Sequence, residues 1–215
     1  MKEQNELLIK QQKKNNRTVI LIFAMSIIPF CIAWYLSSNA TWMGGGTNNG
    51  KLIIPPITTE FNQFVGYDDF SVKNLHEIKG HWILMNVVPN KQCNKVCQFA
   101  IHKTKQLRVM MGKDLTRSRR LVLISAEFEQ TVEQLLWQDE KSGDEQAQED
   151  KRLLKVKFST QLLDKLNKAR KTGVSEGMLF IMDPLGNIMM QYEPEFDPYK
   201  VKSDLRKLLK ISQIG

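Results

Sequence analysis

The longest apolar segment of the sequence lies near its N-terminus. Residues 18–38, TVILIFAMSIIPFCIAWYLSS, contain no charged side chain, and as a helix they are long enough to cross a hydrocarbon layer of about 30 Å. The preceding flank, residues 1–17, is basic, and basic flanks of this kind stay in the cytoplasm. The pattern predicts an uncleaved membrane anchor, with everything after residue 38 exported. A cleaved signal peptide is the alternative, and its usual apolar run of about 7–15 residues is shorter than this one.

The chain loses its apolar pattern after this segment and then regains it. Residues 39–56 are rich in Gly and Asn, which is typical of a flexible tether, and Pro55-Pro56 at its end is expected to stiffen the entry to the next unit. A second unit is predicted over residues 57–215. Within it, residues 127–150 are acidic and rich in Gln, which indicates an insertion at the surface.

The first half of this second unit predicts a strand, a helix and another strand. Residues 81–88, HWILMNVV, form a nearly unbroken apolar run, as expected for a central strand that is covered on both faces. Apolar residues then recur at helical spacing from residue 94 to about residue 111, where Gly112 is a natural C-terminal stop. The apolar run at residues 120–126 predicts the second buried strand.

The second half predicts a helix, a hairpin and a last helix. Ser159 or Thr160 is a suitable N-cap for the first of these helices. The segments MLFIMD and NIMMQY predict two strands around a Pro-Leu-Gly turn, and residues 199–211 predict an amphipathic helix. The order strand–helix–strand–helix–hairpin–helix is that of an α/β, thioredoxin-like fold, here preceded by one N-terminal transmembrane helix.

Composition and charge narrow the class of protein. The 215 residues are 42% hydrophobic and 25% charged, which supports a folded domain beyond the anchor. The formal net charge of +8 would suit a nucleic-acid partner. Part of that charge belongs to the N-terminal flank, and an exported domain does not normally meet nucleic acid. We therefore expect the membrane, and not nucleic acid, as a partner.

Two of the three cysteines lie close together at a predicted strand-to-helix turn. Cys93 and Cys97 are four residues apart, and residues at that spacing share a helix face with Cβ atoms about 5–6 Å apart. This is near the range of a disulfide. A helix N-terminus also favours the thiolate, which is the nucleophile and the metal ligand. The pair is predicted to work in thiol exchange or in metal binding, and an inert structural staple is the alternative.

The segments GHWILMNVVPNKQCNKVC and MLFIMDPLGNIMMQY resemble the Sco/SenC family, thioredoxin-like factors that help to assemble the copper centre of cytochrome c oxidase. The resemblance covers roughly residues 70–214, and the Cys-x-x-x-Cys spacing is its most specific element. It implies Cys93 and Cys97 as the working pair and copper as a candidate cofactor bound by both. It also implies a respiratory oxidase subunit or another assembly factor as the partner. The location it implies is the bacterial inner membrane, with the C-terminal domain in the periplasm.

The chain departs from that family at the third copper ligand. Family members bind copper through the two cysteines and one histidine, which lies a few residues before an Asp-Pro-x-Gly turn. That turn is residues 183–186 here, and counting back by the family's spacing reaches Ser175. The chain therefore resembles a divergent member that lacks the distal histidine.

The three histidines of the sequence are not expected to replace this ligand. His81 opens the first predicted strand and His76 precedes it, so both are expected at the end opposite to the cysteines. His102 lies nine residues past the first cysteine, about 180° around the predicted helix. Two thiolates alone are able to hold Cu(I), with Glu176 or Met178 as helpers near the missing histidine.

Another departure concerns the thioredoxin enzymes, which carry a cis-proline before the strand that faces the cysteines. Residues 171–178, KTGVSEGM, contain no proline. We therefore expect narrow specificity, in a membrane-anchored, periplasm-facing factor that assembles a respiratory oxidase by thiol reduction or copper delivery. The alternative is a redox-silent, thioredoxin-like module that scaffolds an assembly partner.

Overall fold

The structure is a computed structural model, and it describes residues 2–38, 48–130, 152–170, 172–212 and 214. It divides into two compact units, Met1–Thr47 and Asn48–Gly215. Most of the insertion predicted for residues 127–150 lies outside the described residues, as does the first half of the predicted tether, residues 39–47.

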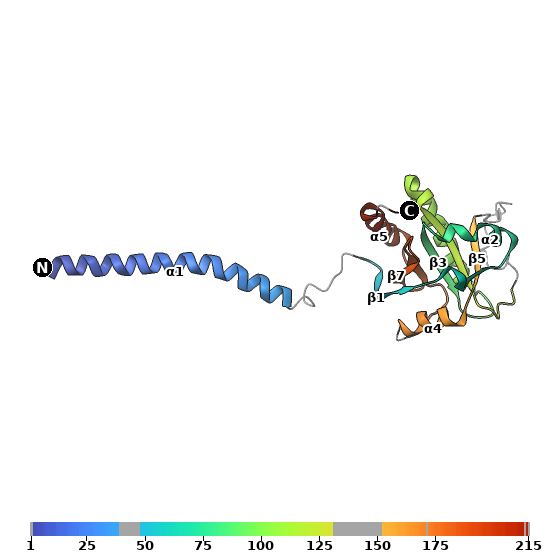
Figure 1. Cartoon of the computed structure of the whole chain (residues 1–215), viewed down its shortest axis with the longest axis horizontal. Helices are drawn as coiled ribbons and strands as arrows, with labels where there is room; N and C mark the ends of the chain where they lie inside the picture. The colour runs from blue at the N-terminus through green and yellow to red at the C-terminus, as the bar shows by residue number, and fades with distance from the viewer. Residues whose placement is uncertain (1, 39–47, 131–151, 171, 213, 215) are drawn as a thin grey trace. The chain divides into compact units, whose positions relative to one another are not determined.

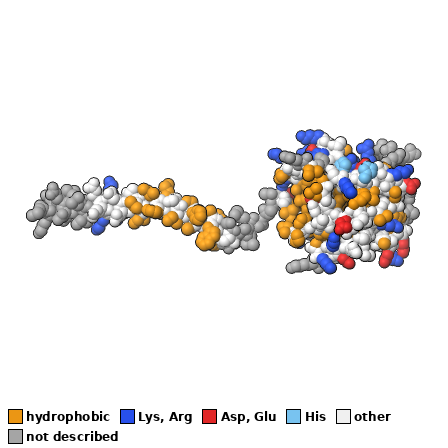
Figure 2. Space-filling model, in the orientation of Figure 1, with side chains coloured by type: hydrophobic (Ala, Val, Ile, Leu, Met, Phe, Trp, Pro, Cys, Tyr) orange, Lys and Arg blue, Asp and Glu red, His pale blue; other side chains and the backbone are white. Residues whose placement is uncertain are grey.

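The N-terminal unit contains one long helix, α1 (Lys2–Ser38). Its segment Gln11–Leu36 is long and apolar enough to cross a membrane, as predicted from residues 18–38. The apolar side chains of this segment are exposed, and Figure 2 shows them as an orange band along the helix. A helix with this composition and with exposed apolar side chains is suited to an apolar environment such as lipid.

The second unit is built on a seven-stranded mixed sheet with the order β1-β7-β6-β3-β4-β5-β2 among its described residues. The strands are β1 (Lys51–Thr58), β2 (Phe64–Gly66), β3 (Trp82–Val88), β4 (Ser118–Ile124), β5 (Leu153–Phe158), β6 (Leu179–Met182) and β7 (Asn187–Tyr192). The three strands β3, β4 and β5 run parallel, whereas β6 is antiparallel to β3 and β7 is antiparallel to β6. Both outer strands, β1 and β2, are antiparallel to their neighbours. This arrangement confirms the predicted thioredoxin-like fold.

Helices cover both faces of the sheet. They are α2 (Asp69–Asn74), α3 (Lys95–Met110), α4 (Thr160–Lys168) and α5 (Pro198–Ile211), with short 3-10 helices at Phe61–Gln63, Leu75–Ile78 and Gly112–Arg117. Figure 1 shows α4 and α5 on opposite sides of the sheet. Two predicted helix ends are confirmed. The Ser159 side chain caps α4 by accepting a hydrogen bond from the N–H of Leu162, and Gly112 follows the end of α3 with a φ of +58°.

The central strand β3 is buried along its whole length, as its unbroken apolar run predicts. Alternate residues point to opposite faces of a sheet. Ile83 and Met85 therefore join one core cluster, with Leu162 of α4. Leu84 joins a second cluster, with Leu205 of α5. The two clusters hold α3, α4 and α5 in fixed positions against the strand that leads to the cysteines.

The tether predicted for residues 39–56 ends too late, because the second unit already begins at Asn48 and β1 occupies Lys51–Thr58. Pro55-Pro56 suggested a stiff linker. The structure places these prolines where the pairing with β7 is interrupted, between Leu52 and Ile57. Prolines are tolerated on an edge strand at such an irregularity, since no ladder hydrogen bond is lost.

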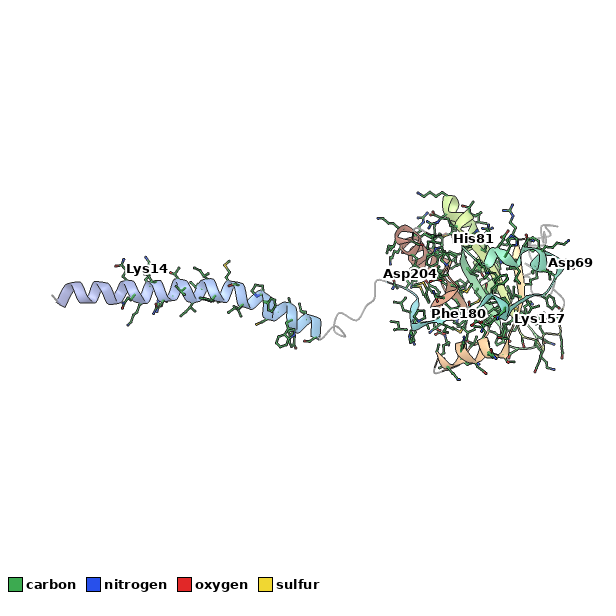
Figure 3. All side chains as sticks on the ribbon, viewed as in Figure 1. Lys14, Asp69, His81, Lys157, Phe180 and Asp204 are labelled. Carbon is green, nitrogen blue, oxygen red and sulfur yellow. A yellow bond between two sulfur atoms is a disulfide. The ribbon has the colours of Figure 1, made fainter. Side chains whose placement is uncertain are left out.

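The start of this unit is held by Asp204 of α5, which Figure 3 labels and whose carboxylate is buried. Its Oδ2 accepts hydrogen bonds from the N–H groups of Asn49 (2.7 Å) and Gly50 (2.8 Å) and from the hydroxyl of Tyr192 (3.0 Å). Burial alone raises the pKa of Asp204, but the hydrogen bonds from Gly50, Tyr192 and Asn49 outweigh it, so the pKa lies below its ordinary value. Asp204 thus fixes the place where the chain from α1 joins the folded domain.

Candidate functional site

The two cysteines form a disulfide at the turn from β3 to α3. Cys93 precedes the N-cap residue Asn94, and Cys97 lies in the first turn of α3. Their Cα atoms are 5.3 Å apart, and the Asn94 side chain accepts a hydrogen bond from the N–H of Cys97 at 3.0 Å. The prediction that the pair lies within bonding distance at a helix start is confirmed. The working role of the pair remains a prediction.

Both cysteines are buried, with exposed fractions of 1% for Cys93 and 2% for Cys97. They belong to a small apolar cluster that includes Ile101 of α3 and Val122 of β4. The partly buried ring of Phe128 packs against this cluster. In the oxidised protein the sulfur atoms are therefore shielded from solvent and from other proteins.

Part of the shield is a short segment that follows β4, residues 127–130, which we call the Cys93 cover. The side-chain oxygen Oε1 of Gln130 accepts a hydrogen bond from the N–H of Cys93 at 2.6 Å. The N–H of Glu129 donates to the carbonyl of Lys91 at 3.0 Å, and the two side chains form an exposed ion pair at 2.9 Å. The ring of Phe128 meets the ring of Tyr67 edge to face, with centroids 6.3 Å apart. No local pattern in the sequence predicts these contacts.

A polar pocket of about 820 Å³ opens beside Cys93. Amide and charged side chains from three segments line it, together with Pro89 and Cys93: Asn90, Lys91, Gln92, Asn94, Lys95, Gln98, Glu127, Glu129, Gln130 and Glu176. Such a lining suits a polar segment of another protein better than an apolar small molecule.

The loop before β6 lies against the first turn of α3. Gly177 has a φ of +79°, and a Cβ atom there would come within 2.8 Å of Cγ1 of Val96. The preceding residue, Glu176, accepts a hydrogen bond from Nδ2 of Asn90 at 2.7 Å through its Oε1. Ser175 is exposed. The loop therefore faces the cysteines as the family spacing predicts, but Glu176 is the residue that lines the pocket.

A buried polar network connects this loop to the strand and the helix that carry the cysteines. Asn86 of β3 is 3% exposed. Its Nδ2 donates to the carbonyl of Met178 at 3.3 Å, and its Oδ1 accepts from the hydroxyl of Thr104 of α3 at 2.5 Å. Buried polar groups that are satisfied in this way fix one arrangement of the elements they join. An asparagine inside the apolar run HWILMNVV was the available signal for it.

A buried arginine supports α3 from below. Nη2 of Arg120 on β4 donates to the carbonyl of Ile101 at 2.9 Å. Burial lowers the pKa of Arg120 to about 9, and the charge of Arg108 adds to the shift. The contact ties the middle of α3 to the sheet one turn after Cys97.

The donors at this site do not fit the two-cysteine, one-histidine copper site of the Sco/SenC family. His76 lies in the 3-10 helix before β3, and Nδ1 of His81 contacts the carbonyl of Glu77 at 3.0 Å. Nε2 of His102 contacts Nε2 of Gln106 on the next turn of α3 at 2.9 Å. In the part of the chain that the structure describes, no three histidine, cysteine or acidic side chains come together in a way that could hold a metal. No described residue therefore supplies the missing third ligand.

Comparison with known proteins gives one family. The family described as "Transmembrane-like, thioredoxin-like, C-terminal domain" matches residues 82–212. No curated protein matches the chain. One similar solved structure is BsSco, a member of the Sco family of cytochrome c oxidase assembly proteins. It is 14% identical with a TM-score of 0.49, over 78% of this chain and 98% of that one.

Two further similar structures have comparable sequence identities and TM-scores. Yeast Sco1 with copper bound is 10% identical, with a TM-score of 0.46 over 64% of this chain and 83% of that one. A putative electron transfer protein from Aquifex aeolicus VF5 is 17% identical, with a TM-score of 0.44 over 66% of this chain and 86% of that one. The family match covers more than half of the chain and includes both cysteines, β3, α3 and the final helix. The chain therefore belongs to the family of transmembrane-like, thioredoxin-like C-terminal domains.

Proposed function

We propose that this chain is a membrane-anchored thiol–disulfide exchange factor of the Sco/SenC type, which acts on the copper-site cysteines of a respiratory oxidase. One observation carries the proposal: Cys93 and Cys97 form a disulfide at a helix N-terminus, beside a polar pocket. A bond that closes so short a loop stabilises the fold little through chain entropy. The position of the disulfide at a helix N-terminus is better explained by a role in thiol–disulfide exchange, because a helix N-terminus stabilises a thiolate.

The reaction begins with the reduced pair. The Cys93 thiolate attacks one sulfur of the partner's disulfide, whose S–S bond breaks, and the released partner thiolate takes up a proton. The Cys97 thiol then loses its proton and attacks the Cys93 sulfur in the mixed disulfide, which releases the partner's second thiolate. The partner is reduced to a dithiol and the chain is oxidised to its disulfide. An exported thiol reductant must then restore the pair.

Thiol reduction fits these residues better than copper delivery does. The family resemblance implies copper, which favours thiolate and imidazole ligands. By the family's spacing the exposed Ser175 takes the position of the histidine, and the described part of the pocket contains no imidazole. Reduction of a partner requires only the two sulfurs.

The proposed location is the bacterial inner membrane, with a cytoplasmic N-terminus and the domain in the periplasm. The basic flank and the long apolar helix support this orientation. The partner would be an oxidase subunit or another assembly factor whose cysteines are exposed on the same side. Protease added to intact spheroplasts is expected to remove the domain, and its protection would contradict the orientation.

The replacement Cys93→Ser tests the proposal against a scaffold that works without redox chemistry. In a strain that lacks the wild-type chain, we expect Cys93→Ser to reduce assembled oxidase activity to the level of the strain without the chain. Membrane abundance and the urea midpoint of the purified chain show whether the fold is intact. Cys31→Ser, which changes the free cysteine in α1, is the matched control and should retain activity. Full oxidase activity in a stable Cys93→Ser chain would favour the scaffold.

A further inference from the structure

Glu176 carries a buried oxygen without a hydrogen-bond partner. Its Oε1 accepts from Nδ2 of Asn90 at 2.7 Å. Its Oε2 is buried, and the described residues offer it no partner. A buried acceptor that stays unsatisfied destabilises the state in which it occurs, so this oxygen requires an explanation.

The position of Glu176 in the fold relates it to the disulfide. Glu176 lines the same pocket as Cys93. The next residue, Gly177, packs its backbone against Val96, which directly precedes Cys97. Two other acceptors near the pair are already occupied: Gln130 accepts from the N–H of Cys93, and Asn94 accepts from the N–H of Cys97.

The redox state of the pair determines whether a donor is present. A disulfide sulfur has no hydrogen to donate. Reduction by a dithiol adds two electrons and two protons, breaks the S–S bond and leaves one S–H group on each cysteine, while the dithiol becomes a disulfide. A thiol is a weak donor, but hydrogen bonds to an ionised acceptor are roughly twice as strong as neutral ones.

We propose that Glu176 accepts a hydrogen bond from the Cys93 thiol in the reduced protein and thereby favours the dithiol over the disulfide. The inference rests on the proposed function, because it assumes that the pair cycles between its two states. Oε2 of Glu176 lacks a hydrogen-bond partner among the described residues in the oxidised state and gains one in the reduced state. It therefore makes the disulfide easier to reduce and the pair ready to act again.

The sign of the effect separates this role from simple charge repulsion. A negative carboxylate near a thiolate disfavours the ionised dithiol, so removal of the charge alone would favour reduction. Removal of a hydrogen-bond acceptor has the opposite result. In Glu176→Gln, Oε1 can keep its bond to Asn90, and an NH₂ group, which cannot accept from a thiol, then replaces Oε2.

The test is a redox equilibrium of the full-length chain in detergent at pH 7. The chain is equilibrated with mixtures of reduced and oxidised dithiothreitol, and free thiols are alkylated and counted by mass. We expect Glu176→Gln to shift the equilibrium toward the disulfide by about tenfold, which corresponds to about 30 mV. Glu127→Gln, which removes an exposed charge at the rim of the same pocket, should stay within about twofold of wild type.

Each outcome decides the inference. A Glu176→Gln equilibrium equal to that of wild type, shifted toward the dithiol, or matched by Glu127→Gln would overturn it. Glu176→Ala provides a second variant without the acceptor, and it should shift in the same direction if Glu176→Gln does not fold. If the wild-type pair is not reduced in the folded chain at any ratio, the proposed function itself fails. If the wild type is reduced and the variants do not differ from it, only the role of Glu176 fails.

Discussion

Loosening the Cys93 cover should make the disulfide easier to reach. Both cysteines are buried, so we expect a reductant to attack only after residues 127–130 move away. If the cover opens and closes quickly compared with the attack, the reduction rate follows the population of the open state. Substitutions that weaken the cover should therefore raise the rate by the factor by which they favour opening.

The contacts of the cover give the expected magnitudes. Gln130→Ala removes the hydrogen bond to the N–H of Cys93, which is worth about 1 kcal/mol and predicts a rate about fivefold higher. Phe128→Ala removes an edge-to-face ring contact and part of a half-buried apolar side chain. Together these are worth about 2 kcal/mol, which predicts a rate about 30-fold higher. Lys91→Gln breaks an ion pair whose side chains are 58% and 59% exposed, so its effect should remain below about threefold.

The assay adds dithiothreitol to the oxidised, full-length chain in detergent and stops the reaction with iodoacetamide at set times. The urea midpoint of each variant shows that the rate reflects a local opening of the folded domain and not its unfolding. From fastest to slowest, the reduction rates should follow the order Phe128→Ala, Gln130→Ala, Lys91→Gln and wild type. Equal rates for the first two variants and wild type would refute the reasoning, because the cover would then not limit access.

The remaining predictions concern stability and metal binding. Asp204→Ala should lower the unfolding free energy by about 3 kcal/mol at pH 7, since a buried charged acceptor with several donors is lost. Because the pKa of Asp204 is lowered in the folded state, the difference in unfolding free energy from wild type should shrink as the pH falls below about 4. Urea unfolding at pH 7 and at pH 3 checks both expectations. Gly177→Ala should destabilise by about 2 kcal/mol more than Gly80→Ala, because both have similar positive φ values but only Gly177 places a Cβ against Val96; equal costs would mean that the loop gives way. Anaerobic competition with a Cu(I) chelator should show weak or no binding by the reduced wild-type chain and tighter binding by Ser175→His, and equal affinities would contradict the assignment of Ser175 to the position of the family's histidine.

The sequence predicted the elements whose pattern is local. The apolar run of β3, the helical spacing of α3 and the Ser159 cap of α4 each appear within a few residues, and all three are present in the structure. The two cysteines were found in the same way, because their spacing and their place at the end of a strand are local features.

Strands that depend on distant partners were missed. In β5 (Leu153–Phe158) the apolar pattern is interrupted by Lys155, which suggests a surface position. Lys155 is instead 4% exposed, and its Nζ pairs with Asp68 at 2.8 Å. In β1 the two prolines concealed an edge strand that pairs with β7. Neither pairing can be inferred without knowing which segment lies alongside.

The surroundings of the disulfide were the least predictable part of the site. Gln130 reaches Cys93 from 37 positions away along the chain, and the contact depends on how the chain leaves β4. The sequence indicates Glu176 only as a candidate copper helper, because it is next to the expected position of the missing histidine. Its bond to Asn90 and its buried second oxygen appear only when the loop is folded against α3.

The central claim, that Cys93 and Cys97 exchange with a disulfide of another protein, is tested most directly by trapping the mixed disulfide. A Cys97→Ser chain can attack through Cys93 but cannot release its partner. The variant is expressed in its native membranes, and the membrane proteins are separated by electrophoresis without reductant. We expect a covalent adduct that contains an oxidase subunit or another assembly factor and that dithiothreitol cleaves. The Cys93→Ser, Cys97→Ser double variant should yield no adduct. An equal amount of adduct from both chains would contradict the claim. So would the absence of an adduct from Cys97→Ser, provided that oxidase assembly in the same strain depends on the wild-type chain.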